Sequence, residues 1–236
     1  MLDPNSPKGR RTLYAAMYEK GVYKSADDGA TWVNNSNGLS TPDMLRVCRL
    51  QLHPDGTLFA MVTGMRSARN GPFKSEGVGL YRWREGAESW QLVNRSKVLL
   101  YPRDFALDPE DSATIYIGAA DAPSGEAERD KRSPQGGLYR TTDAGATWTL
   151  LLRKRSTHFG AALHPKRPGW IYGTGCGWSD APEGGLWLSR DNGKTWQSFP
   201  DLPFANIHRV EFDPADDSVI FVTTFGGSVW RGPAEP

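Results

Sequence analysis

One motif recurs along the chain at a nearly constant spacing, and it constrains the fold more than any other feature. Three copies are well preserved, and they read GVYKSADDGATW from Gly21, GLYRTTDAGATW from Gly137 and GLWLSRDNGKTW from Gly185. A degenerate fourth copy, GLYRWREGAESW, begins at Gly79. Self-similarity at a fixed period of this size indicates a repeat architecture, in which each unit is one supersecondary element.

Two further signals accompany the motif. A short apolar run ending in Asp-Pro or His-Pro lies upstream of each of the four copies and occurs a fifth time after the last copy, with its proline at residue 4, 54, 109, 165 or 214. A segment rich in β-branched and aromatic residues follows each proline, as in TLFAM from Thr57 and TIYIG from Thr114. Such runs bounded by turn residues are typical of strands. Each unit is therefore predicted to hold four short strands, with almost no helix in the chain.

Four-stranded units at this period predict an all-β fold, a β-propeller of antiparallel blades. We expect one domain over residues 1–236 with five blade units, approximately 1–40, 41–96, 97–154, 155–200 and 201–236. The first unit has only Leu2–Pro4 of its inner strand, and the last ends after GSVWRG, so both are incomplete. A five-bladed ring is our expectation. An arc of a larger propeller and a homo-oligomer joined through the incomplete blades are the alternatives.

The three good copies resemble the Asp-box, or bacterial neuraminidase repeat, and the resemblance extends over essentially the whole chain. It is similar to the propellers of sialidases, xyloglucan-active endoglucanases, sortilin-type receptors and photosystem assembly factors. The resemblance implies a structural box whose Asp, Gly and Trp fix a turn between the third and fourth strands. These residues are Asp27, Gly29, Trp32, Asp143, Gly145, Trp148, Asp191, Gly193 and Trp196.

The residue types of the box suit a tight turn. An Asp carboxylate accepts hydrogen bonds from nearby backbone N–H groups, Gly permits a positive φ, and Ser or Thr hydroxyls satisfy further turn groups. The Trp is expected to fill the space between neighbouring sheets. His53 and His164 stand where other units have Asp before the proline, so we interpret both as turn residues and not as ligands.

Composition excludes several classes of function. With 28 basic and 27 acidic residues, the chain has no strong overall field for nucleic acid or an anionic membrane surface. No apolar stretch approaches the length of a membrane span, and Met1–Arg11 has no signal-peptide core. Cys48 and Cys176 lie in different units, which predicts no disulfide framework. We expect no metal site and no cofactor. The family resemblance suggests a secreted or periplasmic protein, although the compartment stays unassigned.

Candidate functional residues come from the loop-bearing face of the blades. The links between second and third strands are long at Thr63–Val78, Gly118–Gly136 and Thr174–Gly184. Long loops on a rigid scaffold often carry function. Aligning the inner strands on their prolines brings several charged residues to one channel mouth. The predicted ligand-binding residues are Arg49, Arg103, Asp104, His158, Trp178, His208 and Arg209.

These residues favour recognition of an anionic or polar glycan, because arginines suit carboxylates and Trp178 offers an apolar face to a sugar ring. The first alternative is a glycoside hydrolase that uses Asp104 with Asp180 or Glu183 as its carboxylate pair. The second is a protein-interaction or assembly scaffold on the same face. A further interpretation of Asp104 is structural, as an ion-pair partner of Arg49 or Arg209.

Overall fold

The structure is a computed structural model, and it describes residues 1–42, 44–66, 73–74, 76–94, 102–120, 136–156, 158–177, 183–200 and 202–236. These residues form strands and turns, with no helix among them. None of the described segments is therefore a helix that could span a bilayer. The chain divides into two compact units, Met1–Leu100 and Tyr101–Pro236.

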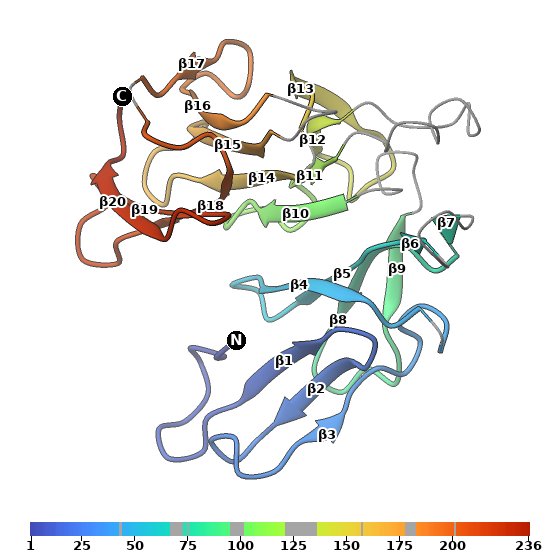
Figure 1. The fold of residues 1–236 in the computed structure, drawn as a ribbon. Coiled ribbons are helices and arrows are strands. Elements are labelled where there is room, and N and C mark those ends of the chain that lie inside the picture. Colours follow the sequence, from blue (N-terminus) through green and yellow to red (C-terminus); the bar gives the residue numbers. More distant parts are fainter. Residues whose placement is uncertain are drawn as a thin grey trace. The chain divides into compact units, whose positions relative to one another are not determined.

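The first compact unit holds the first two blades (Figure 1). The first blade is a three-stranded sheet in the order β1 (Leu13–Met17), β2 (Gly21–Ser25) and β3 (Val33–Asn34). The second is a four-stranded sheet in the order β4 (Val47–Leu52), β5 (Leu58–Val62), β8 (Gly79–Trp83) and β9 (Gln91–Asn94). The sequence did not predict the small hairpin of β6 (Met65–Arg66) and β7 (Phe73–Lys74) between β5 and β8.

The second compact unit holds the third, fourth and fifth blades. The third contains β10 (Pro102–Leu107), β11 (Ile115–Ala119), β12 (Gly137–Thr141) and β13 (Thr149–Arg153). The fourth contains β14 (His158–Leu163), β15 (Ile171–Cys176), β16 (Gly185–Ser189) and β17 (Gln197–Ser198). The fifth has only β18 (Ile207–Phe212), β19 (Val219–Thr224) and β20 (Val229–Pro233).

The sheets confirm the predicted fold class, because each blade is an antiparallel meander and the first and last blades are incomplete. Within the second unit, the inner strands β10, β14 and β18 follow one another side by side (Figure 1). The second strands β11 and β15 are buried along their whole length, because each is covered on both faces. Gly118 permits this packing, since a Cβ there would overlap the Phe159 carbonyl of the next blade.

The turns between third and fourth strands have one repeated structure. In the fourth blade, Asp191 Oδ1 accepts from the Thr195 N–H at 2.9 Å, and Asp191 Oδ2 accepts from the Thr195 hydroxyl at 2.6 Å. Ser189 Oγ accepts from the Gly193 N–H at 2.8 Å. The two bonds from Thr195, together with one from the Ser189 hydroxyl to Asp191 Oδ1 at 2.8 Å, lower the pKa of Asp191 to about 2. The turns around Asp27 and Asp143 make the same bonds.

Positive φ angles explain the glycines of these turns. Asn192 and Gly193 have φ of 61° and 85°, so two consecutive residues are left-handed. Gly145 and Gly29 have φ of 92° and 89° after left-handed Ala144 and Asp28. A left-handed pair matches the twist of the flanking strands, and glycine adopts it without steric cost.

The tryptophans of the repeats differ in their packing. Trp196 donates its indole N–H to Leu151 O of the preceding blade at 3.0 Å, and Trp90 donates to Asn35 O at 2.6 Å. Trp32 is 42% exposed and donates to Gly29 O of its own turn, so the expectation that it fills an inter-sheet space is wrong. Trp32 thus packs on its own turn, unlike Trp196 and Trp90, which reach the backbone of the preceding blade. Trp148 is half-buried, and its N–H has no hydrogen-bond partner among the described residues.

The turns at the five prolines confirm that the two histidines are turn residues. His53 Nδ1 and His164 Nδ1 each accept from the backbone N–H two residues later at 3.1 Å. The Asp residues of the same column use Oδ1 for this bond at 2.9 Å, as in Asp3, Asp108 and Asp213. An imidazole nitrogen therefore replaces a carboxylate oxygen as the acceptor of the turn.

Candidate functional site

A β-bulge recurs near the start of three inner strands. The pairing register shifts between Val47 and Arg49 in β4, between Pro102 and Asp104 in β10, and between Ile207 and Arg209 in β18. The residues left out of register are Cys48, Arg103 and His208. A bulge redirects a side chain while the ladder continues on both sides, and bulges are common next to functional sites. In β14 the register is continuous through Phe159.

The residue after the bulge in β10, Asp104, forms an ion pair with its counterpart in β18. Asp104 Oδ2 lies 3.3 Å from Arg209 Nε, and Asp104 Oδ1 accepts from the Phe105 N–H at 2.9 Å. The Asp104 side chain is fully buried, whereas that of Arg209 is 34% exposed. A buried carboxylate with two donors holds the guanidinium in a fixed orientation. The structural interpretation of Asp104, as a partner of Arg209, is therefore observed.

Gly160 provides the space for this contact. It lies on β14, between the two strands that carry the ion pair, and Asp104 Oδ2 is 3.4 Å from the place of a Cβ on Gly160. Such a Cβ would also lie 2.5 Å from Thr174 Oγ1 and 2.8 Å from His208 O. Because the Thr174 hydroxyl donates to His208 O at 3.0 Å, the fourth and fifth blades are joined at this point.

An aromatic pair lies next to Arg209. His208 stacks on Phe225 with ring centroids 5.7 Å apart and an interplanar angle of 18°. Phe225 is 55% exposed. Burial lowers the pKa of His208, and the charge of Arg209 lowers it further while that of Asp104 raises it. The imidazole is therefore neutral over a wider pH range than usual.

Asn206 organises the loops around this aromatic pair. Its backbone carbonyl accepts from the Phe225 N–H at 2.9 Å, and its Oδ1 accepts from the Gly177 N–H at 3.1 Å. Asn206 thereby connects the link before β18, the link after β15 and the turn after β19. The exposed ring of Phe225 is consequently carried by a turn whose backbone is hydrogen-bonded to Asn206.

Glu183 is held in the link before β16. Its Oε2 accepts from the Arg155 N–H at 2.8 Å, and its Oε1 is 3.4 Å from Lys154 Nζ. The Arg155 N–H is the main cause of a lowered pKa for Glu183, and Lys154 contributes in the same direction. Lys154 Nζ also lies 5.3 Å from the centroid of the Trp187 ring. Glu183 is therefore an ionised acceptor at neutral pH, not a proton donor.

The structure brings together only some of the predicted site residues. Asp104, His208 and Arg209 gather in the second compact unit, and Arg103 occupies the bulge beside Asp104 with its Nε buried and unpartnered among the described atoms. Arg49 lies on β4 in the first compact unit. His158 begins β14, but its side chain is outside the described residues, as are Trp178 and Asp180.

Sequence reasoning missed the contribution of Phe225. The signal that could have found it is an aromatic residue in the turn sequence TTFGGS, where a polar residue is usual. Neither the pairing of His208 with Phe225 nor the bracing by Asn206 can be read from spacing, because both depend on how the loops fold. Among the described residues, no three His, Cys, Asp or Glu side chains gather as a metal site would require.

Comparisons with known proteins show the fold. No protein-family model matches the chain, and no curated protein sequence matches it either. Among solved structures, a GH74 enzyme from Niastella koreensis is 18% identical with a TM-score of 0.63, over 96% of this chain and 35% of that one. YCF48 bound to a D1 peptide is 17% identical with a TM-score of 0.62, over 100% of this chain and 68% of that one.

A GH74 xyloglucanase from Xanthomonas campestris is also similar, with 14% identity and a TM-score of 0.63, over 94% of this chain and 34% of that one. The chain thus spans about a third of the length of these GH74 proteins. At such low identity the similarity establishes the architecture and nothing about activity. These neighbours and the five antiparallel sheets together identify a β-propeller fold.

Proposed function

We propose that residues 1–236 form one propeller domain of the Asp-box type, and that its loop-bearing face binds an anionic or polar glycan. The observation that carries the proposal is Arg209, whose guanidinium is oriented by buried Asp104 through Nε and remains 34% exposed. The terminal nitrogens of Arg209 have no partner among the described residues, so they are available to a carboxylate or hydroxyl group.

Phe225 supplies the second element of the proposed site. An exposed aromatic ring beside oriented polar groups suits a sugar, because the C–H face of the sugar packs on the ring while its hydroxyls are bound at the side. The stack with His208 and the bond to Asn206 O restrict the turn before a ligand arrives. Such preorganisation reduces the entropy lost on binding.

The hydrolase alternative has less support. Both oxygens of Asp104 are engaged and the side chain is fully buried, so it is poorly placed to transfer a proton to a glycosidic oxygen. The lowered pKa of Glu183 suits a general base rather than a general acid. Its suggested partner Asp180 is outside the described residues. The GH74 xyloglucanase among the structural neighbours keeps glycans as the first ligand class to test.

Protein interaction is the second candidate function, and exposed apolar residues of the fifth blade favour it. Phe225, Val229 and Trp230 are 55%, 59% and 46% exposed. Trp230 packs on Phe204 with centroids 5.1 Å apart, and β20 has no fourth strand beside it among the described residues of its sheet. Open edges and apolar patches are common in protein-binding surfaces. The YCF48 neighbour, which is bound to a peptide, makes this candidate concrete.

The deciding experiment is calorimetric titration of the protein with a panel of acidic and neutral oligosaccharides, including xyloglucan fragments. We expect saturable binding of an acidic member, with a loss of at least about tenfold in affinity for Phe225→Ala. The matched control is Leu150→Ala, which removes a 39% exposed apolar side chain from β13. Equal affinity for both variants would reject this site, and no binding by the folded protein would reject glycan recognition.

The same panel tests hydrolysis through the release of reducing sugars. Release that Glu183→Gln abolishes would replace the binding proposal with the hydrolase alternative. Release that is unchanged in both Glu183→Gln and Asp104→Asn would reject the proposed carboxylate pair.

A further inference from the structure

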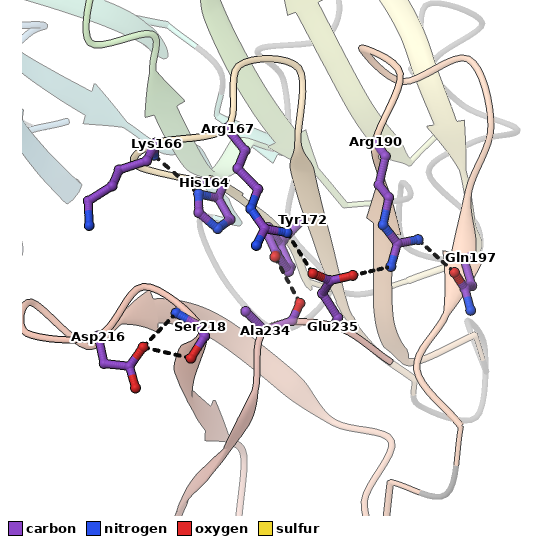
Figure 2. Close-up of polar contacts among 10 residues, drawn as sticks. All are labelled: His164, Lys166, Arg167, Tyr172, Arg190, Gln197, Asp216, Ser218, Ala234 and Glu235. Carbon is purple, nitrogen blue, oxygen red and sulfur yellow. Dashed lines mark hydrogen bonds and ion pairs between the residues drawn. The ribbon is translucent and has the colours of Figure 1, made fainter.

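Two arginines of the fourth blade converge on one carboxylate of the fifth. Arg167 lies in the turn after β14, and Arg190 follows β16. Arg167 Nη1 is 2.6 Å from Glu235 Oε1, and Arg190 Nη2 is 3.1 Å from Glu235 Oε2. Figure 2 shows both guanidinium groups directed at the Glu235 carboxylate from different turns.

A tryptophan and a glutamine orient the two guanidinium groups. The Cζ atoms of Arg167 and Arg190 lie 4.3 Å and 4.9 Å from the centroid of the Trp170 ring. Arg190 Nη1 also donates to Gln197 Oε1 at 2.8 Å. Cation–π contacts and side-chain hydrogen bonds restrict the arginines before any carboxylate binds. The cluster is therefore a formed carboxylate site rather than a pair of loose surface charges.

The residue before Glu235 is recognised through its backbone and its small size. The Ala234 N–H donates to Ser218 O at 2.8 Å, and Ala234 O accepts from the Tyr172 hydroxyl at 2.8 Å in a buried bond. Ala234 is only 2% exposed and belongs to the apolar cluster that includes Leu188. The segment Ala234–Glu235 is thus held through a backbone N–H, a backbone C=O, a small side chain and a carboxylate.

The contacts of the charged part are open to exchange. The side chains of Arg167, Arg190 and Glu235 are 44%, 37% and 48% exposed. Ion pairs at such exposure contribute little net stability, because water and salt compete for them. Arg167 and Trp170 also line a pocket of about 140 Å³, so unfilled space adjoins one of the two arginines.

We propose that Tyr172, Arg167 and Arg190 form a docking site for an extended peptide in which a small apolar residue precedes an acidic residue, and that Ala234–Glu235 fills this site in cis. The cis segment indicates the chemistry of the ligand, since it engages every recognition element of the site. An acidic peptide from a partner protein binds by displacing this segment. This site uses neither Arg209 nor Phe225, so the proposal goes beyond the proposed glycan binding.

Displacement competes with a tethered ligand whose effective concentration is high. The wild-type protein is therefore expected to bind a free peptide weakly, and a change that releases the cis segment is expected to strengthen that binding. Glu235→Arg is such a change, because it places a third positive charge beside two arginines at a side chain that is 48% exposed. A variant that ends at Pro233 removes the segment entirely.

The test measures fluorescence anisotropy of labelled acetyl-Gly-Pro-Ala-Glu-Pro-amide with each folded protein, as established by circular dichroism and melting. We expect Glu235→Arg and the shortened variant to bind at least about tenfold more tightly than the wild type. Replacing Glu by Gln in the peptide is expected to weaken binding by at least about tenfold. Glu88→Arg, the same charge reversal at an exposed position of the second blade, should behave as the wild type.

Two outcomes would overturn the proposal. One is no peptide binding by either opened variant, which would leave Arg167, Arg190 and Glu235 as a purely structural clamp. The other is peptide binding that does not depend on charge. It would be seen as equal binding of the Glu and Gln peptides, or as undiminished binding by an opened variant that also carries Arg167→Gln and Arg190→Gln. Glycan binding is measured on the same variants. It is expected to be unchanged, because releasing Glu235 alters neither Arg209 nor Phe225.

Discussion

Asp104 and Arg209 belong to inner strands of different blades, 105 residues apart in the chain, and meet across the glycine of the strand between them. The contact joins the third blade to the fifth over the fourth. Its two partners are unequal, because Asp104 is fully buried while Arg209 is 34% exposed. Removing the arginine takes a positive charge away from a buried carboxylate, whereas removing the carboxylate leaves a cation that water can reach.

The first prediction concerns this inequality. Arg209→Met is expected to lower the free energy of unfolding more than Asp104→Asn. In Arg209→Met the buried carboxylate of Asp104 stays ionised and loses the guanidinium beside it, whereas Asp104→Asn removes the buried charge itself. We expect losses of roughly 1–3 kcal/mol, below the range for a fully buried pair, since Arg209 is partly solvated. Urea denaturation of both single variants and the double variant measures the coupling. An additive double variant would show that the 3.3 Å contact contributes no stability.

The second prediction concerns Gly160. Gly160→Ala should lower the free energy of unfolding by roughly 1–3 kcal/mol, because its Cβ would lie 2.8 Å from His208 O and 2.5 Å from Thr174 Oγ1. The matched control is Gly232→Ala on β20, where no atom lies within 4 Å of the position that a Cβ would occupy. Thermal melting of both variants distinguishes local overpacking from a general effect of alanine. Equal melting temperatures would contradict the close approach of these strands.

The third prediction concerns the turn of Asp191. The pKa of Asp191 is lowered from 3.8 to about 2 by hydrogen bonds from Thr195 and Ser189. A lowered carboxyl pKa stabilises the folded state above the unfolded value, and this contribution disappears as the pH falls through the folded value. The amide resonance of Thr195 should therefore titrate with a midpoint near pH 2. A midpoint near 3.8 would show that these bonds do not favour the ionised form.

The fourth prediction concerns His164. Burial lowers its pKa from 6.5, and the charge of Arg167 acts in the same direction, against Asp217 and Glu235. Because the folded pKa is the lower one, the contribution to stability is complete above 6.5 and declines as the pH falls below it. His164→Asn keeps an acceptor for the Lys166 N–H and removes the titration.

The measurement is the melting temperature of both proteins between about pH 7.5 and about pH 5.5. We expect the wild type to lose more stability over this interval than His164→Asn, although the variant starts lower because it loses the ring contacts with Trp170 and Phe212. An identical pH dependence of the two melting temperatures would contradict a lowered pKa for His164 in the folded state.

Repetition is the reason why the fold could be predicted. The strand order, the incomplete first and last blades and the turn role of His53 and His164 all follow from comparing one unit with the next. Trp32 was misjudged because the motif specifies the turn that carries the ring but not what packs against the ring. The β6–β7 hairpin was missed because, among the described residues, it occurs in one unit only.

The candidate site could be predicted less completely, since it depends on departures from the repeat. Asp104 and Arg209 were expected near each other, but the sequence left Arg49 as an equal partner. The pairing of Phe225 with His208, and that of Glu235 with Arg167 and Arg190, join residues with no common position in the repeat. Such contacts are set by packing between blades, which no single unit specifies.

The bulge in three inner strands has a consequence for how a fold like this can change its chemistry. Cys48, Arg103 and His208 stand outside the pairing register, while the residues on either side keep their partners. A substitution at a bulge can exchange a thiol, a guanidinium or an imidazole at one end of the blade without shifting the sheet that carries it. The side chains at these three positions can therefore vary while the strand pairing stays the same, and binding preferences can change there with little effect on folding.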